Sequence, residues 1–242
     1  MDPATPSRAR PDHLPAATAL VAVAALSDEL RRRMYGFIRQ TRRPVSREEA
    51  ATSVGISRRL AAFHLDKLVE VGLLRARYEP VGGIRKVGRT PKVYEPTDAQ
   101  VRISIPAREH DLLAGILIDA LLAEDQSKTG REAALQVARH RGAELGAAER
   151  EQARRGRLGA ERALTLATRT LAQYGFEPDR ATPLLLRLHN CPFQPLASRA
   201  PQLVCGINHA FLTGFLDALQ ASTVTAVLAP RAGRCCVELT AG

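Results

Sequence analysis

The first hydrophobic pattern in the chain has helical spacing. Apolar side chains recur in this way between residues 18 and 41, which predicts one helix that Pro44 brings to an end. The positions that carry the pattern are Leu20, Ala24, Leu30, Met34, Phe37 and Ile38. The residues before it are polar and rich in Pro, Ser and Arg, so we assign 1–17 to a flexible arm.

Two shorter helices are predicted next, with a glycine turn between them. Ser46 and Glu49 have the spacing of a capping box, so they predict the start of a helix that ends before Gly55. Ser57 has the character of a second N-cap and opens a helix that runs to Val71. Two helices joined by a turn of this length predict a helix-turn-helix.

A β-hairpin is predicted after these helices. Leu73–Tyr78 and Lys92–Tyr94 are strand candidates, and glycine-containing segments at 81–83 and 88–91 separate them. A basic hairpin in this position has the form of the wing of a winged helix. We therefore assign residues 18–100 to an N-terminal winged helix-turn-helix domain.

Beyond residue 107 the pattern becomes a mixture of helices and strands, so the fold class is α+β. Apolar pairs form a helical stripe that must pack against a second copy of the chain or against its own chain. These pairs are Leu112-Leu113, Ile116-Leu117 and Ala120-Leu121. We assign 107–174 to a helical dimerisation or linker region and 175–242 to a mixed α/β sensing domain. Its predicted elements are strands at 184–188, 224–228 and 235–239 and a helix at 201–219.

The charge balance indicates a polyanionic partner. The 242 residues contain 35 Lys and Arg against 25 Asp and Glu, a net charge of +10. Residues 1–100 hold 18 basic and 11 acidic side chains (+7), whereas 101–242 hold 17 and 14 (+3). The longest near-apolar run, Leu14–Leu26, is too short to cross a bilayer, and acidic residues precede it. We therefore expect a cytoplasmic protein with no membrane partner.

The helix that begins after Ser57 has a face suited to double-stranded DNA. Arginine can donate two hydrogen bonds to guanine in the major groove, and small or aromatic side chains can contact the thymine methyl group. Cations of the wing would neutralise phosphates. The alternative is an ordinary solvated surface. The candidate DNA-binding residues are Ser57, Arg58, Arg59, Ala62, Phe63, His64, Lys67, Arg85, Lys86, Arg89 and Lys92.

All four cysteines lie in the last 52 residues, as Cys191, Cys205, Cys235 and Cys236. Thiols from separate segments can bind a soft metal or an iron–sulfur cluster, but the short CxxC spacing of zinc sites is absent. Neighbouring residues of a strand point to opposite faces, so we expect only one of Cys235 and Cys236 to join a site. A metal-free disulfide switch and plain core packing are the alternatives.

A fourth ligand is less defined. His209 follows Cys205 by four residues and would share its helical face. The other possibilities are Glu238, His189, Asn208, bound water or no fourth ligand at all.

Two stretches of the sequence resemble a known family. Residues 54–74 and Gly88–Tyr94 resemble ArsR-type winged-helix repressors, most closely the longer branch with a C-terminal sensing domain. Asn190-Cys191-Pro192-Phe193, together with the later cysteines, resembles the SufR-type iron–sulfur repressors. The resemblance extends over roughly residues 20–240, and it is more specific in the DNA-binding half.

This resemblance implies a homodimer that reads a palindromic operator and represses while it holds a [4Fe-4S] or [2Fe-2S] cluster. The implied metal ligands are Cys191, Cys205 and Cys235, with Cys236 as the substitute for the third. Residues 217–220 lack the further cysteine that some members carry, and the first cysteine spacing is one residue longer than usual.

Two other functions compete with cluster sensing. An organic effector could bind an apolar pocket of the sensing domain, lined by Leu184, Leu186, Leu188, Phe211 and Phe215. Catalysis would need a nucleophile such as Cys205 with His189, but the sequence has no phosphate-binding glycine loop, nucleophile elbow or HExxH pair. We therefore expect a regulator, not an enzyme.

Overall fold

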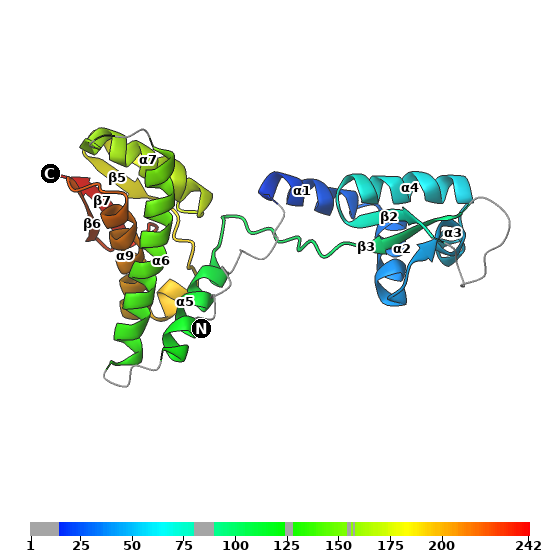
Figure 1. Ribbon diagram of the computed structural model, residues 1–242, viewed down its shortest axis with the longest axis horizontal. Helices are drawn as coiled ribbons and strands as arrows, with labels where there is room; N and C mark the ends of the chain where they lie inside the picture. The colour runs from blue at the N-terminus through cyan, green and yellow to red at the C-terminus, as the bar shows by residue number, and fades with distance from the viewer. Residues whose placement is uncertain (1–14, 80–89, 124–127, 154–155, 157) are drawn as a thin grey trace, which may run out of the picture. The chain divides into compact units, whose positions relative to one another are not determined.

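The computed structural model describes residues 15–79, 90–123, 128–153, 156 and 158–242. The chain divides into two compact units, Met1–Ile103 and Ser104–Gly242. In the N-terminal unit, Figure 1 shows helices around a small sheet. Its elements are α1 (Ala16–Ala25), α2 (Glu29–Thr41), β1 (Val45–Ser46), α3 (Arg47–Val54), α4 (Arg58–Glu70), β2 (Leu74–Tyr78) and β3 (Lys92–Pro96).

The single helix predicted over 18–41 is two helices, α1 and α2. Asp28 has an extended backbone, and its carboxylate accepts a hydrogen bond from the Arg31 backbone N–H at 2.9 Å, so Asp28 is the N-cap of α2. The Arg31 guanidinium also donates to the carbonyl of Ala25 at 2.6 Å, and Arg32 donates to that of Leu26 at 3.1 Å. These side chains satisfy the carbonyls at the end of α1 and stabilise the break.

Helices α3 and α4 confirm the predicted helix-turn-helix. The Ser46 hydroxyl accepts from the Glu49 backbone N–H, and the Glu49 carboxylate accepts from that of Ser46, which completes the capping box of α3. Gly55 adopts φ +73° after α3, a left-handed conformation that favours glycine. Ser57 caps α4 by accepting from the Leu60 backbone N–H.

The N-terminal sheet has the strand order β1-β3-β2, and both pairs are antiparallel. Strands β2 and β3 are the stem of the predicted hairpin, with Arg75 opposite Glu95. Its tip lies at residues 80–89, outside the described residues. Helix α4 packs its apolar face towards this sheet and α2. The largest fully buried side chains here are Tyr94, Met34, Ile38, Leu65, Leu68 and Leu74.

The C-terminal unit combines the two regions that the sequence analysis separates at residue 175, and their side chains share one hydrophobic core. Its helices are α5 (His110–Leu122), α6 (Gly130–Gln152), α7 (Ala160–Gln173), α8 (Leu196–Arg199) and α9 (Pro201–Ala218). Its strands are β4 (Pro178–Thr182), β5 (Leu185–Leu188), β6 (Val224–Leu228) and β7 (Val237–Ala241). They form an antiparallel sheet in the order β4-β5-β7-β6.

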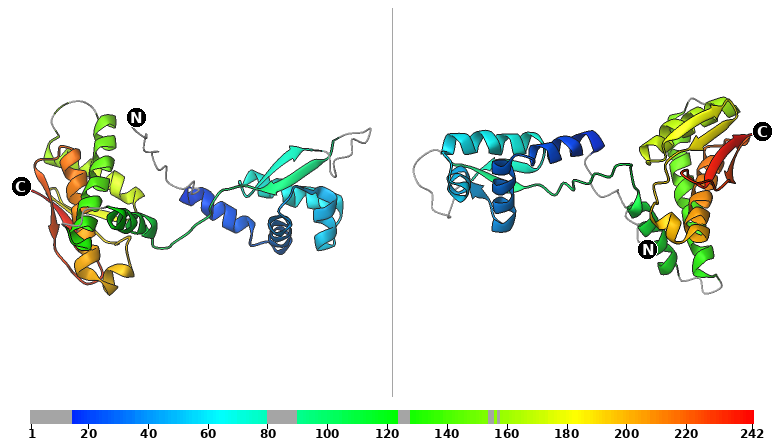
Figure 2. Two further views of the ribbon diagram at one scale, coloured as in Figure 1. Left: turned by 60° about the horizontal axis from the view of Figure 1, so that its bottom comes forward. Right: turned by 180° about the vertical axis from the view of Figure 1, so that it is seen from behind.

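Helices α6 and α9 are the most closely packed pair in the C-terminal unit, and they lie side by side in Figures 1 and 2. A Cβ atom on Gly142 would collide with the backbone carbonyl of Phe211, and one on Gly214 would collide with that of Arg139. Glycine is therefore required where the two backbones meet. This close crossing holds α9 against the rest of the core.

Two details of this unit differ from the prediction. Strand β4 is absent from the elements predicted for residues 175–242. Strand β7 begins at Val237, so Cys235 and Cys236 precede it and do not lie on a strand. The Cys235 backbone N–H donates to the carbonyl of Leu188 at 2.9 Å, which holds this loop against the end of β5.

Candidate functional sites

Helix α4 presents several of the predicted DNA-binding residues to solvent. Arg58 and Arg59 are exposed, and Phe63 exposes 56% of its surface. Arg58 forms an ion pair with Glu48 at 3.4 Å. Ala62 on the same helix is half-buried. This face therefore offers cationic and aromatic groups together, as major-groove contacts require.

His64 lies elsewhere. Its side chain is buried, its Nδ1 atom is 3.9 Å from a carboxylate oxygen of Asp28, and its ring contacts the edge of Phe63 with centroids 5.4 Å apart. The structure thus places His64 among core-facing residues, away from the exposed face on which the sequence analysis put it. Its contact with Phe63 supports the position of that exposed ring.

Lys92 is held by an acidic residue of α4. Its ammonium group lies 2.7 Å from the carboxylate of Asp66, and this contact raises the pKa of Lys92. The buried Tyr94 donates its hydroxyl to the same carboxylate at 3.3 Å. Asp66 therefore fastens the base of the wing to α4, a role that the sequence analysis did not assign to it. Lys67 is likewise paired, with Glu70 at 2.7 Å.

The remaining wing candidates, Arg85, Lys86 and Arg89, lie outside the described residues. Ser57 serves as the N-cap of α4 and is exposed.

The four cysteines form a thiol cluster in the C-terminal core. Cys191 follows β5, Cys205 lies in the second turn of α9, and Cys235 and Cys236 precede β7. Cys191, Cys235 and Cys236 are buried, and Cys205 is half-buried. Side-chain interactions join Cys191 to Cys235, Cys235 to Cys236, and Cys236 to Cys205. The thiols of these three segments therefore interact in pairs.

The prediction that Cys235 and Cys236 lie on a strand is wrong, because β7 begins after them, and which of the two would join a metal site stays a prediction. That expectation assumed a strand, in which consecutive side chains point in opposite directions. The bend at Cys236 removes this alternation.

Three of the thiols resist ionisation. Interaction with Cys235 and burial raise the pKa of Cys191 far above its usual value, and burial raises that of Cys205. Contact with Cys191 lowers the pKa of Cys235, but contact with Cys236 and burial outweigh it and raise the pKa to about 12. As free thiols these groups are protonated at neutral pH, and protonated thiols are weak nucleophiles.

Asn208 is a polar side chain that is buried beside the thiols. Its side chain is fully buried, and its amide nitrogen donates to the Cys235 sulfur at 3.1 Å. The Oδ1 atom of Asn208 has no hydrogen-bond partner among the described residues. A buried acceptor without a partner is costly, so Asn208 beside the thiols marks a place where a further group can bind.

The other candidate fourth ligands are engaged by the protein. The His209 ring is hydrogen-bonded to the carbonyl of Ala226 at 3.0 Å. Glu238 lies 3.4 Å from Arg187, and His189 lies 3.5 Å from Asp179.

Within the described part of the chain, no three His, Cys, Asp or Glu residues are arranged around a single metal ion. Cysteine thiolates hold an iron–sulfur cluster by binding its different iron atoms. The donor set, soft sulfur atoms in an apolar core, suits an iron–sulfur cluster.

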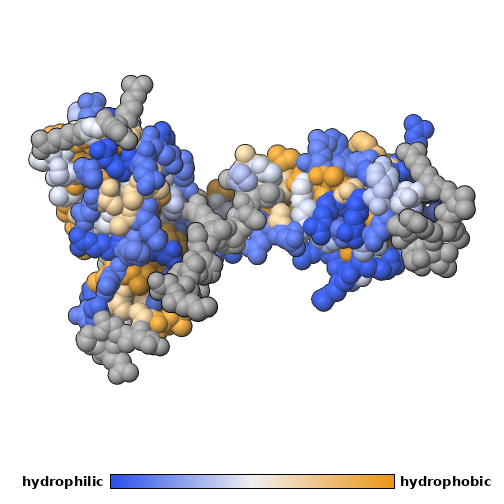
Figure 3. All heavy atoms as spheres, viewed as in Figure 1, coloured by the Kyte–Doolittle hydropathy of each residue, from blue (hydrophilic) through white to orange (hydrophobic). Residues whose placement is uncertain are grey.

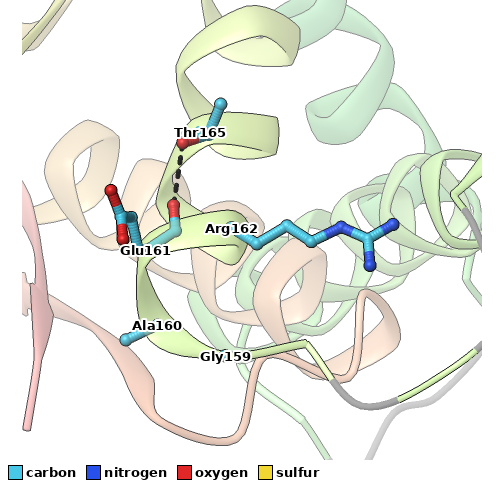
Figure 4. Close-up of a pocket in the computed structure, with 5 residues that line it drawn as sticks. All are labelled: Gly159, Ala160, Glu161, Arg162 and Thr165. Carbon is cyan, nitrogen blue, oxygen red and sulfur yellow. Dashed lines mark hydrogen bonds between the residues drawn. The ribbon is translucent and has the colours of Figure 1, made fainter.

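The residues predicted to line an effector pocket lie in different surroundings. Leu186, Leu188, Phe211 and Phe215 are buried in the core, and Leu184 is exposed. A shallow surface pocket of about 500 Å³ lies at the start of α7. Figure 4 shows its lining, in which Arg162 points away from Glu161 and the Thr165 hydroxyl donates to the carbonyl of Glu161. This lining is largely one turn of a helix.

None of the helices in the described residues combines the length and the apolar character that a membrane span requires. A search of curated proteins found no match to the chain. Residues 26–77, which include α2, α3 and α4, match the family model of a helix-turn-helix domain. This match supports a DNA-binding transcriptional regulator of a winged-helix family.

Proposed function

We propose that this protein is a transcriptional repressor that senses an iron–sulfur cluster through Cys191, Cys205 and Cys235. The observation that carries the proposal is the thiol cluster, in which cysteines far apart in sequence interact in one core. Cys236 lies in the same cluster and can replace Cys235 as the third ligand. An iron–sulfur cluster would supply a group that oxidants or loss of iron can remove.

The chain's own residues favour this proposal over a metal-free disulfide switch. Reactive thiols have a lowered pKa and lie in electropositive, accessible surroundings. Here the pKa values of Cys191, Cys205 and Cys235 are raised, and two of the three thiols are buried. Metal binding instead removes the thiol protons directly, so uptake of iron improves as the pH rises.

We further propose that the repressor is a homodimer that reads a palindromic operator. Apolar side chains are exposed on α1 and α5, and in Figure 3 orange residues reach the visible surface of both units. A second copy of the chain could bury them. The exposed residues are Leu20, Val21, Val23, Ile118, Leu121 and Leu122. Light scattering should give twice the chain mass, and Leu121→Glu with Leu122→Glu should lower it.

Anaerobic reconstitution tests the cluster. The full chain is incubated with ferrous iron and sulfide, and iron, sulfide and visible absorption are measured. We expect uptake by the wild type, loss in Cys191→Ser and Cys205→Ser, and a smaller loss in Cys236→Ser than in Cys235→Ser. A protein that binds neither iron nor sulfide, or equal uptake by all four variants, would contradict the proposal.

Operator binding tests the regulatory role. Duplexes are first selected from random sequence by the purified protein, and their affinities are then measured with and without reconstitution. We expect the two forms to differ by at least about fivefold, the lower end of typical allosteric coupling. Equal affinities would leave a DNA-binding protein that does not respond to its thiols.

A further inference from the structure

The segment that leads into α5 is fastened to the loop that carries Cys191. The Arg108 guanidinium donates to the Asn190 side-chain oxygen at 2.6 Å. The Asn190 amide nitrogen donates in turn to the backbone carbonyls of Ala107, at 2.9 Å, and Gly175. The side chain of Asn190, which precedes Cys191, thus bonds to both Ala107 and Arg108 of this segment.

Two further hydrogen bonds continue this attachment along the chain. The Glu109 backbone N–H donates to the carbonyl of Pro192 at 2.9 Å. The His110 ring is bonded through Nε2 to the carbonyl of Gln194 at 2.7 Å. Residues 107–110 therefore follow residues 190–194 in register, and we call these contacts the linker clamp.

The linker clamp is stiff because its central group is buried. Asn190 exposes only 6% of its surface, and its side chain bonds to Arg108, Ala107 and Gly175. Separating the two segments would break the bonds of Asn190 to Arg108 and Ala107 and leave its buried side-chain oxygen without the Arg108 donor, which is costly. When the Cys191 loop moves, residues 107–110 should therefore move with it.

Along the sequence, the clamped segment lies between the DNA-binding unit and the rest of α5. Residue 104 is the first of the C-terminal unit, so residues 104–109 are the chain connection from the DNA-binding unit to α5. We infer that Asn190 and Arg108 are positioning residues that transmit the state of Cys191 to this connection. The consequence for DNA binding rests on the proposed function, but the mechanical coupling does not.

The coupling can be measured at the thiol, because loosening residues 107–110 should loosen the loop that carries Cys191 and make its thiol more accessible. The full chain is treated with iodoacetamide, and alkylation of Cys191 and Cys205 is followed by peptide mass spectrometry. The clamp variants are Arg108→Ala and His110→Ala. The control is Arg139→Ala, whose ion pair with Asp217 on α9 at 2.6 Å lies outside the clamp.

We expect both clamp variants to alkylate Cys191 several-fold faster than the wild type, with Cys205 and the control unchanged. Loss of the Arg108 charge alone would slow the reaction, because a nearby cation favours the thiolate. Faster alkylation therefore reports a loosened loop. Unchanged rates in both clamp variants would overturn the inference.

Operator binding separates this inference from the proposed function. If reconstitution changes the affinity of the wild type, the clamp variants should keep their iron and lose most of that change. Clamp variants that keep the full change would show that the signal takes another route. A wild type that does not respond defeats cluster sensing, while the alkylation rates still decide whether the clamp couples the two segments.

Discussion

Helices α4 and α9 carry candidate functional residues of the two units, but they present them in opposite ways. Helix α4 exposes Arg59 and Phe63, whereas α9 buries Asn208 fully and Cys205 in part. A large exposed side chain adds little to the stability of the core, so its chemical type points to function. A buried thiol also packs as a small hydrophobe, so its type alone is ambiguous. The role of α9 therefore depends on which residues surround its buried side chains.

The largest expected effect concerns the packing of α9. Gly142→Val places methyl groups against the Phe211 carbonyl and should lower the free energy of unfolding of the C-terminal unit by about 3 kcal/mol. Differential scanning calorimetry should show that the transition of the N-terminal unit is unchanged. Gly130→Ala, in the same helix but with no atom within 4 Å of the added Cβ, is the control. Equal effects of both substitutions would mean that the crossing is not tight.

A second prediction concerns the exposed face of α4. Arg59→Ala should weaken operator binding by about 1–3 kcal/mol, or roughly 5- to 160-fold, if Arg59 contacts a base. Fluorescence anisotropy with the selected operator measures this loss. Arg139→Ala removes the same charge from an exposed position of the C-terminal unit and should have little effect. A loss of equal size in both variants would indicate a general charge effect.

A third prediction concerns the capping box of α3. Interaction with Arg43 and with Ser46 lowers the pKa of Glu49 to about 2. A lowered pKa means that the carboxylate stabilises the folded unit above about pH 4.5 and loses this contribution as the pH falls towards about 2. Ser46→Ala should cost about 1 kcal/mol. Glu49→Gln should flatten the acid dependence in urea unfolding, and an unchanged profile would contradict the assignment.

The smallest expected effect concerns the contact between Lys92 and Asp66. Both side chains remain partly exposed, so a double-mutant cycle should give a coupling of about 0.5 kcal/mol in the stability of the N-terminal unit. Because Lys92 is already paired, Lys92→Ala should reduce the salt dependence of DNA binding by less than one phosphate contact would. A decrease in salt dependence as large as that of one full phosphate contact would show that Lys92 leaves Asp66 to contact DNA.

Local signals predicted the N-terminal unit well. The capping residues Ser46 and Ser57 and the turn residue Gly55 act on their immediate neighbours, and α3 and α4 begin and end close to the predicted residues. The break at Asp28 was missed even though an N-cap residue stands there, because the apolar spacing on both sides continued across it. Here a hydrogen bond to the backbone outweighed the hydrophobic pattern.

In the C-terminal unit, local patterns predicted individual elements but not the contacts between distant segments. The helix at α9 and the strand at β6 were predicted from their own residues. The loop before β7 depends on the bond from Cys235 to Leu188, and no local pattern announces a partner so distant in sequence. The same applies to Asn190, whose side chain bonds to residues from two other segments.

By itself, the sequence determined the helix-turn-helix, the basic character of the N-terminal unit and the presence of four cysteines near the C-terminus. These features depend on composition and on residues close together in the chain. Only the tertiary structure decided that three of the cysteines are buried in one core, that His64 and Asn208 are buried, and that Arg108 bonds to Asn190 beside Cys191. Such contacts join distant segments, and their geometry follows from how the whole core packs.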